Sequence, residues 1–288
     1  MVPFELAEPE SLVEAVAMLD PEDSSVRPIA GGTALMLMMK SGLYRPRRLV
    51  SLRKIGSGLA DIRLGADGSL KIGAMARLVD LRRSAEARSA APVIAETLLT
   101  HSNVRVRNVA TIGGNLAHAD PHMDLPPVLM VLGARISAVG PTGEREFAVE
   151  NLLTGYLETA LNNSELITTV TVPPQSGWRT VYLKCTARSA DDWPALGIAI
   201  SIHIEERIVR DVRIAVGAAT ETARRLPGTE ALLAGRVLND PLMREASRAA
   251  AIEAPVVADQ HGSAEYKRVL VEVHLRRVLA RLQQEAIA

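Results

Sequence analysis

The sequence contains very little cysteine and no excess of charge of either sign. Its 288 residues include one cysteine, Cys185, which cannot form an internal disulfide or by itself hold a zinc ion or an iron–sulfur cluster. The 33 basic side chains are balanced by 33 acidic ones, whereas a nucleic-acid-binding protein normally carries a basic excess that neutralises phosphates. We therefore expect no disulfide scaffold, no iron–sulfur cluster in this chain and no nucleic-acid partner.

Long apolar runs are also missing. No run reaches the length of about 18 residues that a membrane-spanning helix needs. The amino-terminal stretch MVPFELAEPE is acidic and has no apolar centre, so it does not resemble a signal peptide. With 48% apolar and 23% charged residues, the composition is that of a folded protein. We expect a cytoplasmic protein of two or three packed units, because 288 residues exceed the usual size of one domain.

Aromatic residues make up only 3% of the chain, so the core must consist of aliphatic side chains and methionine. Ser11 and Glu14 form a capping box at the start of a predicted helix. After the loop 173–177 the apolar pattern predicts three strands and then three helices, which is typical of an α+β layer. The predicted strands are 179–186, 195–204 and 207–218, and the predicted helices are 229–234, 241–253 and 266–284.

The first segment with a chemical signature is AGGTAL at 30–35, directly after a predicted strand. Glycine lacks a Cβ, so the backbone can approach a ligand closely, and successive amides can bind an anion. A Gly-Gly pair after a strand is more often a plain turn. The spacing also matches neither the dinucleotide-binding fingerprint nor the P-loop.

A second Gly-Gly pair lies in TIGGN at 111–115, within a segment 110–125 that we expect to be a loop of fixed conformation. Two loops of this kind suit a ligand with two phosphates, and the carboxylate of Asp124 suits a ribose or another diol. Asp124 is equally well placed to cap the helix that Pro126 and Pro127 would begin. The segment therefore has both a ligand-binding and a purely structural interpretation.

Histidine and aspartate alternate at His118, Asp120, His122 and Asp124, which resembles a set of metal ligands. The prolines at 121, 126 and 127 disfavour the extended strand that would put these side chains on one face. We therefore expect solvated or hydrogen-bonded loop residues, with Asp120 solvated, and assign no metal site. No Gly-x-Ser-x-Gly elbow or nucleophile–base pair is present, so no catalytic residue is assigned.

The two Gly-Gly segments together carry a family resemblance. AGGTALMLMMKSGLYRPRRLVSLRKI at 30–55 and VRNVATIGGNLAHADPHMDLPPVLMVLGA at 106–134 resemble the flavoprotein (medium) subunit of the molybdenum hydroxylases. This family includes bacterial carbon monoxide dehydrogenase and xanthine dehydrogenase-like hydroxylases, and the resemblance covers the whole chain. It implies an α+β fold with FAD-binding subdomains at 1–57 and 58–176 and a C-terminal domain, a three-stranded sheet with helices, at 177–288.

The resemblance also implies a cofactor site. The backbone amides of both Gly-Gly loops would wrap the FAD pyrophosphate, and Asp124 would hold the ribose or ribityl region. Leu166 would lie against the flavin ring and Lys184 near it. His101 and Trp193 match aromatic residues beside and over the cofactor less closely, and Trp193 fits ordinary packing equally well. The implied cofactor-binding residues are Pro28, Ile29, Ala30, Gly31, Gly32, Thr33, Ala34, Leu35, His101, Thr111, Ile112, Gly113, Gly114, Asn115, Asp124, Leu166, Lys184 and Trp193.

Two departures from the family pattern stand out. Ala34 occupies a position where many relatives have Ser or Asp, which removes a side-chain contact but leaves a nest of main-chain amides intact. The segment LAHADPH at 116–122 carries histidines where relatives often have small polar residues. These histidines would alter either ligand entry or a subunit contact.

The function implied by the resemblance is that of an FAD-carrying subunit in a heterotrimer, or in a dimer of heterotrimers. A large partner with molybdopterin hydroxylates the substrate, a small partner carries two [2Fe–2S] clusters, and the flavin passes their electrons to an external acceptor. Such a subunit needs no general acid or nucleophile. One alternative is a self-sufficient FAD oxidoreductase, for which only His118, His122 and Lys184 could act as acid or base. Another is an adaptor that has lost FAD.

Overall fold

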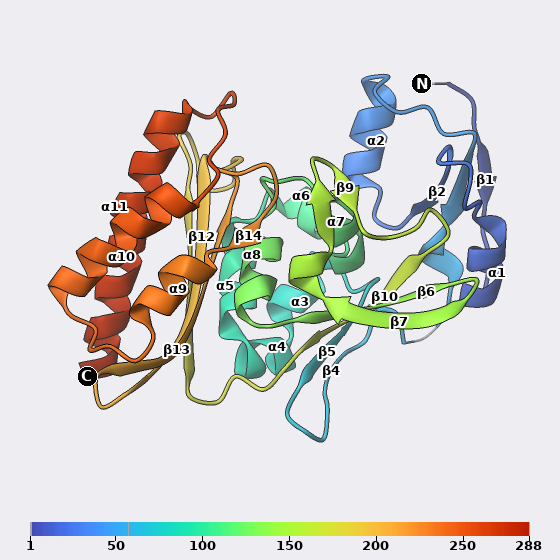
Figure 1. Ribbon diagram of the computed structural model, residues 1–288. Coiled ribbons are helices and arrows are strands. Elements are labelled where there is room, and N and C mark those ends of the chain that lie inside the picture. Colours follow the sequence, from blue (N-terminus) through green and yellow to red (C-terminus); the bar gives the residue numbers. More distant parts are fainter. Residues whose placement is uncertain (1, 57, 288) are drawn as a thin grey trace.

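The computed structural model describes residues 2–56 and 58–287 and contains three main sheets (Figure 1). The first sheet is parallel, with strand order β1-β3-β2. The predicted cap of its first helix is confirmed, because the Ser11 hydroxyl accepts a hydrogen bond from the Glu14 amide. The elements of this part are β1 (Glu5–Ala7), α1 (Leu12–Met18), β2 (Val26–Ile29), α2 (Thr33–Lys40), β3 (Arg48–Ser51) and the 3₁₀ turn Leu52–Lys54.

The second sheet is antiparallel, with order β4-β5-β10-β6-β7 and β10 at its centre. Its strands are β4 (Ile62–Leu64), β5 (Leu70–Gly73), β6 (Arg135–Gly140), β7 (Gly143–Ala148) and β10 (Leu166–Val172). Six helices lie between β5 and β6, namely α3 (Leu78–Arg83), α4 (Ala85–Ala90), α5 (Pro92–Thr100), α6 (Val104–Arg107), α7 (Ile112–His118) and α8 (Leu125–Val131). A 3₁₀ turn (Val149–Asn151) and the ribbon of β8 (Leu153–Gly155) and β9 (Glu158–Thr159) precede β10.

The third sheet confirms the predicted α+β fold of the C-terminal part. Three long antiparallel strands are followed by three helices, as the sequence predicts, and a two-residue fourth strand at the edge was not predicted. The strands are β11 (Trp178–Cys185), β12 (Leu196–Glu205), β13 (Ile208–Gly217) and β14 (Arg224–Arg225). The helices are α9 (Pro227–Leu233), α10 (Asp240–Glu253) and α11 (Ala264–Ile287).

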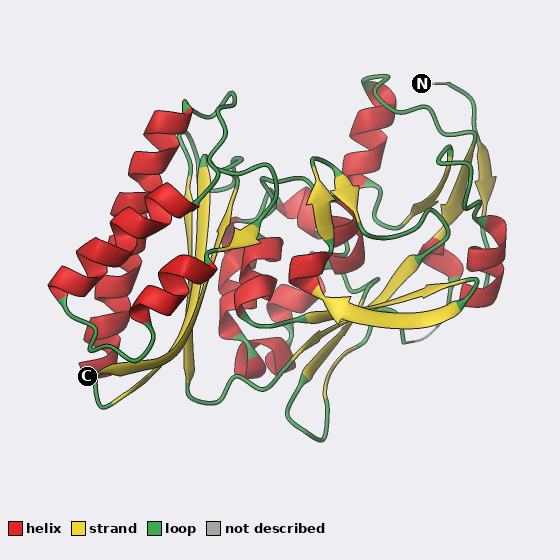
Figure 2. Cartoon of the chain, viewed as in Figure 1, coloured by secondary structure: helices red, strands yellow, loops and turns green. Residues whose placement is uncertain are grey.

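This sheet lies between two layers of helices (Figure 2). Helices α9 and α11 pack against one face, and α8 packs against β12 and β13 from the other. All seven residues of α8 are buried, as expected of an apolar helix enclosed between two sheets. Helix α8 therefore fixes the C-terminal part against the middle of the molecule.

The prediction that 110–125 is a loop throughout is wrong, because α7 occupies Ile112–His118. Thr111 caps this helix by accepting a hydrogen bond from the Gly114 amide. Gly113 and Gly114 lower the helix propensity of the segment and interrupt its apolar periodicity. The sequence pattern therefore did not indicate a helix. A threonine three residues before Gly114 is the capping signal that could have revealed it.

The domain boundaries after residues 57 and 176 stay predictions. Met1, Ser57 and Ala288, which are the end residues of predicted domains, lie outside the described residues. The three main sheets fall within 5–51, 62–172 and 178–225. Among the described residues, no helix is both long enough and apolar enough to cross a membrane.

Candidate functional site

The two Gly-Gly segments lie against each other. A Cβ added at Gly31 would be 2.3 Å from the carbonyl oxygen of Val109, so only glycine permits this approach. A Cβ added at Gly114 would lie 3.8 Å from the Cβ of Ala30. Segments 30–35 and 111–115 therefore form one surface.

The first segment offers a row of amides with no partner. Gly32, with a φ of +69°, is the N-cap of α2, and no side chain caps this helix. Among the described residues, no hydrogen bond is donated by the amides of residues 31–35. The first amides of a helix have no acceptor within it and point outward at the positive end of the helix dipole. This segment can therefore bind an anion such as a phosphate.

The second segment uses the amides of residues 112–115 within the chain, which differs from the expectation that both loops wrap a pyrophosphate. The amides of Ile112 and Gly113 donate to the carbonyls of Ala76 and Ala74. Those of Gly114 and Asn115 donate to the hydroxyl and the carbonyl of Thr111. These four bonds anchor α7, so residues 112–115 can contact a ligand only through their side chains and the glycine surface.

Asn115 supplies such a side chain. It is 8% exposed, and its Oδ1 is buried with no hydrogen-bond partner among the described residues. Its Nδ2 faces the sulfur of Met123 at 3.0 Å and the Nε2 of His101 at 3.4 Å. A buried carbonyl oxygen without a donor is costly in a protein that binds nothing there. Asn115 therefore indicates a ligand that donates a hydrogen bond.

Asp124 is the centre of a buried polar cluster. Its Oδ2 lies 2.7 Å from Nδ1 of His101 and accepts a hydrogen bond from Lys184 Nζ at 3.2 Å. Its Oδ1 accepts one from the hydroxyl of Tyr182 at 2.6 Å. Asp124 stands at the N-cap position of α8 without making a side-chain cap, so the capping alternative does not describe what its carboxylate does.

Tyr182 is the member of this cluster that the sequence reasoning missed. Burial, and then the negative charge of Asp124, raise the pKa of Tyr182 well above its usual range, so its hydroxyl keeps its proton and donates. Tyr182 and Lys184 are two positions apart in β11 and share a face. Because Lys184 was a predicted site residue in a predicted strand, the residue two positions before it, Tyr182, could have been predicted to face the same site.

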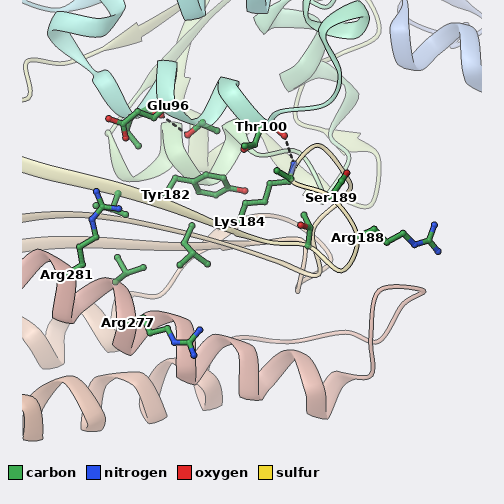
Figure 3. Close-up of a pocket in the computed structure, with 15 residues that line it drawn as sticks. Glu96, Thr100, Tyr182, Lys184, Arg188, Ser189, Arg277 and Arg281 are labelled. Atoms are coloured by element: carbon green, nitrogen blue, oxygen red, sulfur yellow. Dashed lines mark hydrogen bonds between the residues drawn. The ribbon is translucent and has the colours of Figure 1, made fainter.

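The cluster borders a cavity of about 610 Å³ between α5, β11 and α11 (Figure 3). Lys184 crosses toward α5, where its ammonium also donates to the carbonyl of Thr100 at 2.9 Å. Arg277 and Arg281 of α11 lie on the opposite wall, and the side chain of Arg188 points away from the cavity. Lys184 is thus tied to both Asp124 and the end of α5.

Leu166 lies elsewhere. It is 3% exposed and packs in the small apolar cluster of the amino-terminal part, with Ala15, Val16 and Val50. Its neighbour Ile167 packs in the central core instead. The packing of Leu166 leaves almost no surface for a flavin ring, which argues against the contact that the resemblance implies.

The histidine segment is folded back on itself. Asp120 is 4% exposed and accepts hydrogen bonds from the amide of His122 at 2.8 Å and from its ring at 3.2 Å, so the expectation that Asp120 is solvated is wrong. The His122 ring lies 5.3 Å from the ring of Trp193, whose side chain is 45% exposed. The structure therefore brings Trp193 next to this segment.

Comparison with known proteins places the chain in a family. A model described as the FAD binding domain in molybdopterin dehydrogenase matches residues 2–175, and one described as the CO dehydrogenase flavoprotein C-terminal domain matches residues 181–282. The carbon monoxide dehydrogenase medium chain of Afipia carboxidovorans is 33% identical over 99% of both chains. The glyceraldehyde dehydrogenase medium chain of Sulfolobus acidocaldarius is 30% identical over 94% of this chain and 95% of its own.

Solved structures agree with these matches. A chain of reconstituted CO dehydrogenase from Oligotropha carboxidovorans superposes with a TM-score of 0.92 at 31% identity, covering 99% of each chain. A chain of quinoline 2-oxidoreductase from Pseudomonas putida 86 superposes with a TM-score of 0.91 at 26% identity. Both parts of the fold, including the third sheet and its helices, therefore occur together in these relatives.

Proposed function

The chain belongs to the molybdenum hydroxylase family as an FAD-binding medium subunit, and we propose that it holds FAD between the two Gly-Gly segments and passes electrons from a partner to an external acceptor. FAD supplies the redox chemistry when it is bound. The relatives imply a large partner that carries molybdopterin and a small partner that carries [2Fe–2S] clusters. We infer a heterotrimer, or a dimer of heterotrimers, in the cytoplasm.

The single observation that carries this proposal is that main-chain amides of residues 31–35 and the side-chain carbonyl of Asn115, on facing segments, have no hydrogen-bond partner among the described residues. The amides of residues 31–35 can bind the pyrophosphate at the start of α2. Because these contacts come from the main chain, Ala34 leaves them intact, although it lacks the side-chain contact of the Ser or Asp in many relatives. On the facing segment, the buried Oδ1 of Asn115 can accept a hydrogen bond from a hydroxyl of the ribityl chain.

Asp124 serves in this proposal as a positioning residue. Both of its carboxylate oxygens are already used within the chain, so its main task is to fix its neighbours. It orients His101 and keeps the ammonium of Lys184 in place at the edge of the cofactor site. A direct contact of Asp124 with a sugar hydroxyl is compatible with this role, because a carboxylate oxygen can accept more than one hydrogen bond.

The geometry favours the subunit over a self-sufficient oxidoreductase. That alternative needs a free acid or base, and its three candidates all have partners. Lys184 is bound to Asp124 and Thr100, and His122 to Asp120 and Asp259. His118 lies 3.8 Å from Asp120. An adaptor without FAD would have no use for the unused amides of α2 or the unpaired oxygen of Asn115.

The test is to mix the FAD-loaded chain, without oxygen, with a chemically reduced iron–sulfur partner and to follow the visible absorbance of the flavin. We expect rapid bleaching by the reduced partner and slow bleaching by any organic substrate added to the isolated chain. Fast bleaching by an organic substrate alone would support the self-sufficient enzyme. A chain that binds no FAD would support the adaptor.

A further inference from the structure

His122 is clamped between two carboxylates from distant parts of the sequence. Its Nδ1 lies 3.2 Å from Oδ1 of Asp120, and its Nε2 lies 2.9 Å from Oδ2 of Asp259. An imidazole can donate to both only when both of its nitrogens carry protons. The geometry therefore indicates an imidazolium.

The clamp fastens the histidine segment to the C-terminal part. Asp259 also pairs with Nζ of Lys267 at 2.6 Å, and Lys267 is fully buried. The same ammonium donates to the carbonyl of Ala218, whose amide donates to the carbonyl of Pro121. A continuous network of hydrogen bonds thus joins residues 120–122, the end of β13 and the start of α11.

The ring of Trp193 contacts the ring of the clamped His122. The indole is tilted by 31° to the His122 ring at a centroid distance of 5.3 Å, while the His261 ring lies 5.0 Å from His122. A cation within about 6 Å of an indole is attracted to its face. The loop that carries Trp193 also approaches the His101 segment, because Arg107 donates to the carbonyl of His101 and lies 4.0 Å from Asp191.

We propose that His122, held as an imidazolium by Asp120 and Asp259, is a positioning residue that fixes the indole of Trp193 at the edge of the flavin site. The contact between the two rings stands on its own geometry. Only the identity of the neighbouring site rests on the proposed function. The proposal also gives a role to one of the histidines at 116–122 that depart from the family pattern.

The charge on His122 makes this contact dependent on pH. Burial disfavours the charge, but the hydrogen bonds to Asp120 and Asp259 outweigh it and raise the pKa of His122 above its usual value of about 6.5. The stabilisation from the charged clamp is therefore fully present below that usual value and is lost as the pH rises through the raised one. The other charged or titratable groups facing the clamp are His118, Asp192, His261 and Lys267.

The experiment uses the full chain with Trp178→Phe, so that Trp193 is the one tryptophan left. Phenylalanine keeps a ring where Trp178 lies under the guanidinium of Arg213. A protonated imidazole quenches the fluorescence of an indole in contact with it. We expect the emission of Trp193 to rise in a single titration as the pH is raised from mildly acidic to alkaline.

Adding His122→Gln should abolish this titration and make Trp193 more accessible to a soluble quencher. His118→Gln is the matched control, because this histidine lies in the same segment and contacts Asp120 without touching Trp193; it should leave the titration in place. A titration that persists in His122→Gln, or an emission in the parent that does not change with pH, would overturn the proposal.

A separate measurement tests the flavin neighbourhood. An indole in contact with the isoalloxazine quenches flavin fluorescence, so Trp193→Leu in the FAD-loaded chain should brighten the flavin. Unchanged flavin fluorescence would reject the placement of Trp193 at the flavin and leave the His122 contact standing. A brightened flavin together with a titration that persists in His122→Gln would reject the His122 contact and leave the placement of Trp193 at the flavin standing.

Discussion

The Nδ1 atom of His101 lies 2.7 Å from the Oδ2 atom of Asp124, and both side chains are buried. The two residues come from the end of α5 and the start of α8, so this contact joins two helices at the point where the proposed flavin site begins. Tyr182 and Lys184 complete the set of partners around the same carboxylate. Removing that carboxylate leaves three polar groups without their common acceptor.

We therefore predict that Asp124→Asn destabilises the chain even without FAD. Lys184 is 8% exposed and would lose its counter-charge, and breaking a buried ion pair on one side costs about 3–5 kcal/mol. Urea unfolding of the FAD-free chain should show a loss of this order. Asp61→Asn, at an exposed carboxylate, should change the unfolding free energy by less than about 0.5 kcal/mol.

A second variant tests the cause. Asp124→Asn combined with Lys184→Met removes the charge left unpaired and should recover much of the lost stability. A double variant as unstable as the single one would show that the ion pair is not the main contribution of Asp124. FAD titration of the double variant should still show weakened binding, because both residues that orient the site are gone.

The sequence predicted those parts of the fold that local patterns encode. Ser11 and Glu14 form the predicted cap, and the three strands predicted after residue 177 are present. Helix α7 escaped prediction because two glycines conceal its periodicity. The partners of Asp124 and His122 escaped as well, since Tyr182 and Asp259 lie 58 and 137 positions away and only tertiary packing brings them in.

The register of β10 determines which core each of its residues enters. In a strand, successive side chains point to opposite faces, so a shift of one residue moves a side chain to the other side of the sheet. Leu166 packs in the amino-terminal cluster and Ile167 in the central core. The contact of Leu166 with a flavin ring therefore stays a prediction.

Gly114→Val should abolish FAD binding and leave the chain folded. Gly114 is helical and is not in the left-handed region, so a side chain there causes no backbone strain. Valine is expected to prevent binding because it occupies space above the helix that FAD needs. A Cβ there meets only the Thr111 hydroxyl at 3.0 Å and the Cβ of Ala30 at 3.8 Å. The fold can accept that crowding, but the added methyl groups would extend over the surface that faces residues 30–35.

Gly31→Ala is the contrasting variant. Its Cβ would lie 2.3 Å from the carbonyl oxygen of Val109, which is backbone and cannot turn away. We expect loss of both stability and FAD binding, seen by thermal unfolding and by visible absorbance after gel filtration. If Gly114→Val keeps stoichiometric flavin, the surface over α7 is not part of the cofactor site.

Asn115→Leu should weaken FAD binding and also destabilise the FAD-free chain modestly. The substitution removes a buried oxygen that has no partner, but it also leaves the buried Nε2 of His101 without its contact to the Asn115 amide, which costs about 1–3 kcal/mol. Loss of one hydrogen bond of about 0.5–1.5 kcal/mol corresponds to roughly a two- to tenfold loss of affinity. Quenching of flavin fluorescence on titration measures it, with Asn163→Ala as control at a partly exposed asparagine that bonds to the carbonyl of Pro21.

FAD should bind without a covalent bond. Residues 31–35 and 111–115 contain no histidine or cysteine, and the nearby His101 has both ring nitrogens engaged, with Asp124 and Asn115. Precipitation of the loaded chain with acid should release all of the yellow colour into the supernatant. Colour that remains with the washed precipitate would show a covalent attachment and contradict this arrangement.

Asp120→Asn should leave FAD affinity nearly unchanged while lowering the stability of the chain at neutral pH. Burial disfavours the charge of Asp120, but hydrogen bonds from His122 outweigh it and hold the pKa of this carboxyl below its usual value of about 3.9. Asp120 therefore contributes stability above that value and loses it as the pH falls through the lowered one. The difference in unfolding free energy between parent and variant, about 1–3 kcal/mol at neutral pH for a hydrogen-bonded charge, should shrink in acid. Urea unfolding measured across the acidic range checks this, and a difference that stays constant down to the acid transition would show that the charge of Asp120 is not what holds His122.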